Sequence, residues 1–148
     1  MFSQASITIA RSPEQVFPYV DEPDKLKLWM ADFISSTRST DQPESPFTMT
    51  FKQMGGGDAT RETISEILAY QPSRQITYKT VDQSFEVVID FALIQQGRNT
   101  QVTQTVNATP RNAIFKVVMG VLGRLLARAS AKQLQRDLDK LKQVVEGG

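Results

Sequence analysis

Hydrophobic and polar positions alternate along most of the chain, with a helical period only near its two ends. From Phe2 to Ala10, Ala5, Ile7 and Ile9 share one face, which predicts a half-buried strand. Ser12-Pro13-Glu14-Gln15 has the spacing of a helix start, and Pro23 begins a second short helix. Strand-like alternation then predicts strands at about 33–40, 47–54, 59–70, 74–81, 85–95 and 100–108.

A single helical pattern runs from about 112 to 145, roughly 34 residues or about 51 Å long. Two short helices offer too little surface to cover its apolar stripe, so it must lie across the sheet. The connections between strands are short and carry turn residues, which indicates antiparallel hairpins; Gly55–Gly57 is expected to form one of these turns. The pattern predicts an α+β fold in which an antiparallel sheet of about seven strands wraps around a long C-terminal helix, with two short helices after the first strand.

Composition narrows the chemistry further. The 148 residues fit one domain spanning 1–148, and the net charge of +1 gives no argument for binding nucleic acid. The chain has no Cys and no His, which removes thiolate chemistry, the commonest general base and the commonest transition-metal ligand. We therefore expect no catalytic triad, no metal site and no cofactor. The N-terminal residues lack the features of a signal peptide, and the longest apolar run is too short to span a bilayer, so a cytoplasmic setting is expected.

The order of elements resembles the START-related superfamily, which includes lipid-transfer START domains, pollen-allergen-type ligand binders and bacterial polyketide cyclase/dehydrase-like proteins. The resemblance covers the whole chain and is carried by residues 7–17, Asp21, Trp29, residues 64–67 before 71–74, residues 76–78 and residues 138–142. It implies the helix-grip fold, in which a curved sheet holds a long helix. Family members bind sterols, lipids, quinones or aromatic polyketides, modify them, or act as co-chaperones, so the resemblance implies the fold more firmly than the activity.

The sheet-facing stripe of the last helix changes from large to small residues. Leu134, Leu138, Leu141 and Val145 form the stripe, and its projection toward the N-terminus reaches Ala131, Ala127, Gly123 and Gly120. Small residues would leave space beneath the first half of the helix, which predicts a cavity there. The alternative is that the glycines only permit close packing or a kink.

The candidate ligand-binding residues combine the aromatic and apolar side chains expected near that cavity with two carboxylates. They are Trp29, Phe51, Glu62, Tyr78, Asp90, Phe91, Val106, Met119 and Gly123. For the aromatic residues the alternative is ordinary core packing. Asp90 stands in a strongly apolar stretch, although such a residue commonly faces solvent on an antiparallel sheet, and Arg61 is the alternative to Glu62.

Three functions remain open. The first is non-enzymatic binding or transport of a small hydrophobic ligand, such as a lipid, quinone or aromatic polyketide-like metabolite. The second is a cyclase or dehydratase in the same cavity, with Tyr78, Glu62 or Asp90 moving protons and no metal. The third is a co-chaperone-like interaction module without a real cavity.

The outer face of the last helix suggests a contact surface. Ile114, Val118, Val121, Leu122 and Leu125 form an apolar patch that merges into a basic face with Arg124, Arg128 and Lys132. A second copy of the chain or an anionic membrane would cover it, and the small net charge slightly favours a homodimer. The alternative is a helix that kinks at Gly120 or Gly123 and buries these residues in the core.

Overall fold

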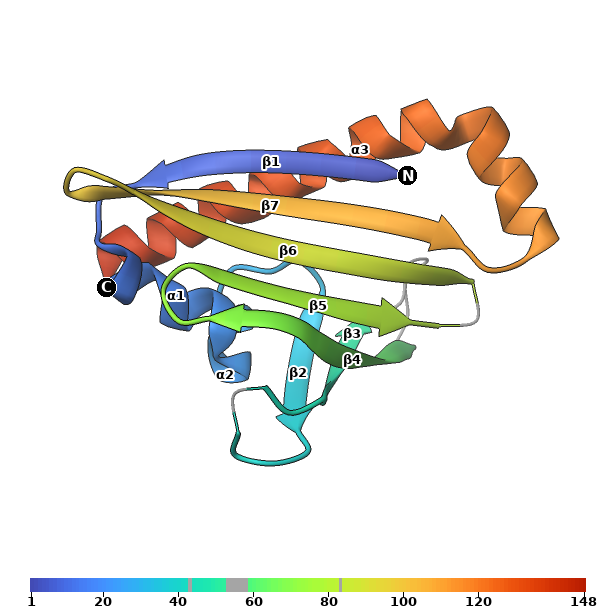
Figure 1. The fold of residues 1–148 in the computed structure, drawn as a ribbon. Coiled ribbons are helices and arrows are strands. Elements are labelled where there is room, and N and C mark those ends of the chain that lie inside the picture. The colour runs from blue at the N-terminus through green and yellow to red at the C-terminus, as the bar shows by residue number, and fades with distance from the viewer. Residues whose placement is uncertain (43, 53–58, 83) are drawn as a thin grey trace.

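A computed structural model describes residues 1–42, 44–52, 59–82 and 84–148 of the protein. Figure 1 shows a strongly curved sheet with a long helix across it and two short helices at one end. The elements in chain order are β1 (Phe2–Ile9), α1 (Pro13–Asp21), α2 (Pro23–Leu26), β2 (Phe33–Arg38), β3 (Phe47–Lys52), β4 (Thr60–Gln71), β5 (Gln75–Val81), β6 (Phe85–Gln96), β7 (Asn99–Pro110) and α3 (Ala113–Gly147).

The seven strands form one antiparallel sheet in the order β1-β7-β6-β5-β4-β3-β2. The strands from β2 to β7 follow one another as a meander, and β1 closes the sheet beside β7. Helix α3 lies on one face of the sheet, and α1 and α2 follow β1 in the sequence, before β2. The chain therefore has the predicted helix-grip fold (Figure 1). The turn predicted at Gly55–Gly57 lies outside the described residues.

Local sequence explains where the helices α1 and α3 begin. The backbone N–H of Ser12 donates to Oε1 of Gln15 at 3.2 Å, as the spacing of these two residues predicts for the start of α1. At α3, the side chain of Asn112 accepts from the backbone N–H of Phe115 at 2.9 Å. Both caps satisfy backbone donors that would otherwise lack partners, so each helix begins within a residue of its predicted start.

The second part of α3 lies along β1. Ser3 Oγ donates to the carbonyl of Ala127 at 3.2 Å, and Lys142 Nζ donates to the carbonyl of Thr8 at 2.9 Å. Strand and helix therefore run in the same direction over residues 127–142. Leu134, Leu138, Leu141 and Val145 are buried in this region, as the apolar stripe predicts. Their side chains hold the helix on the sheet.

The first part of α3 extends past the strand that supports the rest of the helix. β1 has 8 residues and spans about 26 Å, whereas the 35 residues of α3 span about 52 Å. Figure 1 shows the orange first part of α3 standing beyond the end of the sheet and bending before it joins the part along β1. Phe115 nevertheless anchors the start of the helix against Phe85 of β6, with ring centroids 5.1 Å apart.

The bend does not bury the apolar patch. Ile114 is 75% exposed, Val121 is 77% exposed and Leu125 is 65% exposed. Leu122 is exposed as well, and Val118 is half-buried. The alternative of a kinked helix that packs these residues into the core is therefore wrong. A helix twice as long as its supporting strand has no protein surface on which to bury them.

A charged cluster fixes α1 to the sheet on the other side of the core. Asp21 accepts hydrogen bonds from Arg38 of β2 at 3.3 Å and from the hydroxyl of Tyr70 of β4 at 3.0 Å. Burial raises the pKa of Asp21, and burial together with the Asp21 carboxylate raises the pKa of Tyr70 to about 12. Both carboxylate oxygens of Asp21 have partners, so the cluster has a structural role. Asp21 is one of the residues that carry the resemblance to the START-related superfamily.

Candidate functional site

A cavity of about 480 Å³ lies between the inner face of the sheet, the second part of α3 and the segment after α2. Its size is within the range of about 300–1,000 Å³ that is typical of small-molecule sites. The apolar wall comes from Met30, Ala31, Met49, Phe51, Tyr78, Ile89, Val106 and Leu134. Polar and charged groups from Asp32, Lys52, Arg61, Gln104, Gln133 and Asp137 complete the lining.

Alternation along the strands puts these side chains on one face. On β5 and β6, the paired residues Tyr78 and Ile89 both point inward, and Ile89 pairs in turn with Val106 of β7. The same period places Gln104, two residues before Val106, on the inner face. Burial raises the pKa of the Tyr78 hydroxyl further above its ordinary value of about 10, at which the group is already protonated at neutral pH.

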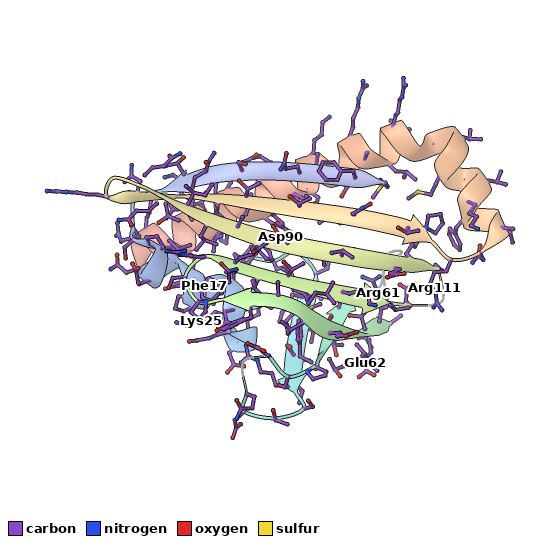
Figure 2. The ribbon with its side chains drawn as sticks, in the orientation of Figure 1. Phe17, Lys25, Arg61, Glu62, Asp90 and Arg111 are labelled. Atoms are coloured by element: carbon purple, nitrogen blue, oxygen red, sulfur yellow. The ribbon has the colours of Figure 1, made fainter. Side chains whose placement is uncertain are left out.

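Two cationic side chains stand on the β3 and β4 side of the cavity. Lys52 and Arg61 are both exposed, and Figure 2 shows Arg61 beside Glu62 near the start of β4. The guanidinium of Arg61 lies 5.5 Å from the centroid of the Phe51 ring and 3.7 Å from Oδ2 of Asp82. The exposure of these two cations places their charge at the rim of the cavity.

Asp137 brings a half-buried carboxyl group to the helix side of the cavity. Burial raises its pKa, although Gln133 Nε2 donates to Oδ1 at 2.9 Å and the backbone of Ala31 also donates to the group. The nearby charge of Asp32 acts in the same direction as burial. The carboxyl therefore keeps its proton to a higher pH than an exposed Asp does.

The structure brings three of the predicted binding residues together, because Phe51, Tyr78 and Val106 all line the cavity. Trp29 and Phe91 are instead 3% and 0% exposed and pack edge to face in the core, with ring centroids 5.8 Å apart. The indole N–H of Trp29 donates to the carbonyl of Tyr19 at 2.8 Å. Both residues belong to the hydrophobic core and are outside the cavity lining.

The two predicted carboxylates lie on the other face of the sheet. Glu62 is exposed and follows the inward-facing Arg61 on β4, so the alternative choice of Arg61 matches the cavity lining. Asp90 precedes the buried Phe91 on β6 and accepts hydrogen bonds from Thr77 Oγ1 at 2.5 Å and Gln75 Nε2 at 2.8 Å. These two partners explain why a carboxylate is tolerated in an apolar stretch.

Met119 and Gly123 lie in the part of α3 that extends beyond β1 and are outside the cavity lining. A Cβ added at Gly120 or Gly123 would meet nothing within 4 Å, so close packing does not require either glycine. The cavity lies farther along the helix than the small-residue stripe indicates. The reason is that the stripe leaves the sheet where β1 ends.

Chemistry in the cavity would rest on few groups. Within the described ranges, no three Asp or Glu side chains are grouped so that they could hold a metal ion. The proton-moving groups proposed for a cyclase or dehydratase are separated, since Tyr78 faces the cavity while Glu62 and Asp90 face away from it. Asp32 and Asp137 are the carboxyl groups that do line it.

Residues 3–146 match the model of the family described as polyketide cyclase / dehydrase and lipid transport. The chain belongs to this family. The match spans the sheet, the cavity and nearly all of α3, and the family is one of the polyketide cyclase/dehydrase-like groups that the sequence resembles.

Solved structures share the fold over the whole chain. A START superfamily protein from Mycobacterium smegmatis superposes with a TM-score of 0.78 at 14% identity, covering 99% of this chain and 97% of that one. A protein from Thermus thermophilus gives 0.77 at 16% identity, with 99% and 98% covered. A protein from Deinococcus radiodurans superposes with a TM-score of 0.72 at 17% identity, with 100% of both chains covered. No curated protein matches the sequence. Family and fold together indicate hydrophobic ligand binding.

Sequence reasoning missed several residues of the cavity wall, among them Met49, Ile89, Gln104 and Asp137. A signal for Gln104 was present, because it has the same phase as Val102 and Val106 on β7 and is thus a polar residue on an apolar face. Asp137 directly precedes Leu138 of the buried stripe. Neither signal says which strand lies beneath which turn of the helix, and that relation decides the lining.

Proposed function

We propose that the protein binds and carries one small hydrophobic ligand in the cavity beneath α3. The observation that carries this proposal is a cavity of about 480 Å³ whose wall is mainly apolar. A ligand that buries about 300 Å² of apolar surface gains roughly 7.5 kcal/mol at about 25 cal/mol per Å². Association costs offset part of this gain, so affinity depends on how well the ligand fills the cavity.

Native mass spectrometry of protein purified from its own host tests the proposal. We expect a fraction of the protein to carry one neutral apolar molecule per chain, released at raised collision energy and identified after solvent extraction. The same protein stripped with organic solvent should take up hydrophobic fluorescent probes at one site. A native protein with its bare sequence mass that also binds no probe after stripping would contradict the proposal.

We further propose that the first part of α3 docks on an anionic membrane surface. Its exposed apolar face is made of Ile114, Val117, Val121 and Leu125, spaced by three or four residues as one side of a helix requires. A contiguous face of this kind costs free energy when it is bare. Partial insertion at the level of lipid headgroups would remove that cost.

The charge around this face favours a membrane over a second copy of the chain. No Asp or Glu occurs between Asp90 and Asp137, whereas the basic residues in that stretch include Lys116, Arg124, Arg128 and Lys132. The overall net charge of +1 therefore conceals a strongly cationic segment. Two copies of this segment would repel each other, while each Lys or Arg near an anionic bilayer contributes about 1 kcal/mol.

Leu125→Glu is expected to prevent docking. The parent should float with vesicles of phosphatidylcholine containing phosphatidylglycerol, should float less as salt is raised, and should ignore pure phosphatidylcholine. The variant should stay with the soluble fraction because it places a negative charge in the apolar face. Ile94→Glu is the matched control, since Ile94 is 56% exposed on β6 of the sheet. A parent that dimerises in sedimentation and ignores anionic vesicles would support the second copy instead.

A further inference from the structure

Gln104 is the buried polar residue of the cavity wall. Its side chain is 4% exposed and lines the cavity from the inner face of β7. Within the part of the chain that the structure describes, Oε1 of Gln104 is buried and has no hydrogen-bond partner. Its cross-strand neighbours are Ala5 and Phe91, whose side chains offer none.

Two other groups of buried polar side chains on the inner face are paired within the protein. Ser65 Oγ and Thr80 Oγ1 are 2.7 Å apart, and Thr100 Oγ1 donates to the carbonyl of Arg11 at 2.8 Å. Ser36 and Thr63 also have unpaired hydroxyl oxygens among the described residues, but neither lines the cavity. Gln104 is thus distinguished by combining burial, an unpaired acceptor and a position in the cavity wall.

We infer that the cavity takes an apolar molecule that carries a neutral hydroxyl group, an alcohol or a phenol, and that this hydroxyl pairs with Gln104. The inference rests on the proposed ligand-binding function and narrows its ligand class. A primary amide offers one acceptor oxygen and two N–H donors, and a hydroxyl both donates and accepts. Because Oε1 itself is fully buried, pairing requires the side-chain amide to turn toward the cavity, where a hydroxyl can donate to Oε1 and also accept from the amide nitrogen.

Hydrocarbons and carboxylates match the site less well. A hydrocarbon would leave the buried amide unpaired, which is unfavourable in a site that water has left. An ionised carboxylate has no proton to donate to Oε1, and its charge would lose hydration away from the exposed Lys52 and Arg61. Tyr78, whose phenol is uncharged at neutral pH, lines the same cavity.

A ligand pair of equal size isolates the hydroxyl. The ratio of the dissociation constants of 2-methylnaphthalene and 2-naphthol is measured for the parent and for Gln104→Met, which keeps the length of the side chain and removes its polar atoms. We expect this ratio to fall about five- to tenfold in Gln104→Met, the equivalent of one net hydrogen bond. Comparing this ratio between the parent and the variant cancels the difference in aqueous solubility between the two probes. 2-Naphthoate, the carboxylate analogue, should bind the parent more weakly than 2-naphthol.

Gln101→Met is the matched control. Gln101 is on the same strand but faces the other side of the sheet, where it accepts from Gln96 Nε2 at 3.3 Å. Its substitution should leave the ratio unchanged. If both probes bind and the ratio is equal in parent and Gln104→Met, the inference is overturned while the proposed function stands. If no probe binds the parent, the proposed function fails and the inference fails with it.

Nuclear magnetic resonance of the parent gives a test that needs no folded variant. The side-chain amide signals of Gln104 should shift more on addition of 2-naphthol than of 2-methylnaphthalene at equal saturation. Equal shifts would overturn the pairing, since they would report only the displacement of solvent from the cavity.

Discussion

Val106→Trp is expected to weaken the binding of hydrophobic probes by more than about tenfold while leaving the protein folded. Val106 lines the cavity from the inner face of β7, opposite Ile89 of β6 in the strand register. An indole at this position extends into the empty volume instead of displacing packed atoms, so the strain of overpacking a full core should be avoided. Loss of about 1.4 kcal/mol of binding free energy already corresponds to tenfold, and a ligand excluded from half of the cavity loses more. Probe titration and thermal melting measure the two effects.

Gly123→Leu separates the observed cavity from the site expected from sequence. A cavity beneath the first half of α3 would be filled by this change, and binding would fall. The structure places open space around Gly123, outside the cavity lining, so binding should be unchanged. Replacing a glycine within a helix should also stabilise the protein, by about 0.5–1 kcal/mol. Weaker binding in Gly123→Leu, with Val106→Trp unaffected, would place the ligand beneath the extended part of the helix.

The architecture could be predicted because each of its elements has a strong local signal. The alternation in the strands, the capping residue Ser12 and the long final helical pattern all indicate the same fold. The apolar stripe from Leu134 to Val145 identified the part of α3 that is buried. Local agreement of this kind determines which face of each element is buried, and the antiparallel order follows from the short connections.

The position of the cavity required information that no local pattern contains. Projecting the stripe back to Gly123 assumes that sheet continues beneath the whole helix, but β1 supports only the second part. Strand alternation predicts that the side chains of Glu62 and Asp90 point to the opposite face of the sheet from those of the residues next to them. It does not predict which face of the sheet lines the cavity. Phe51, Tyr78 and Val106 were found because they are apolar and in phase with the core. Gln104 and Asp137 depend on how sheet and helix meet.

The second part of α3 is held on the sheet by its buried leucines and by Val145. Leu138→Ala is expected to lower the free energy of unfolding by about 2–5 kcal/mol, because Leu138 is fully buried and the change leaves a cavity between helix and sheet. Many domains have only about 5–15 kcal/mol of stability in total. Urea denaturation should show a much lower midpoint with a similar slope, as expected if the folded structure is otherwise kept.

Leu125→Ala provides the matched comparison on the same helix. Leu125 is 65% exposed in the part that extends past β1, so its truncation should change the free energy of unfolding by no more than about 0.5 kcal/mol. The two variants remove the same atoms, and Ala favours a helix at both positions. Any difference between them therefore reports where the helix is held. Similar losses in both would mean that the first part of α3 is also packed in solution, and the membrane-docking face would no longer be available. A loss confined to Leu138→Ala leaves that face free, because docking then uses exposed side chains that contribute little to folding.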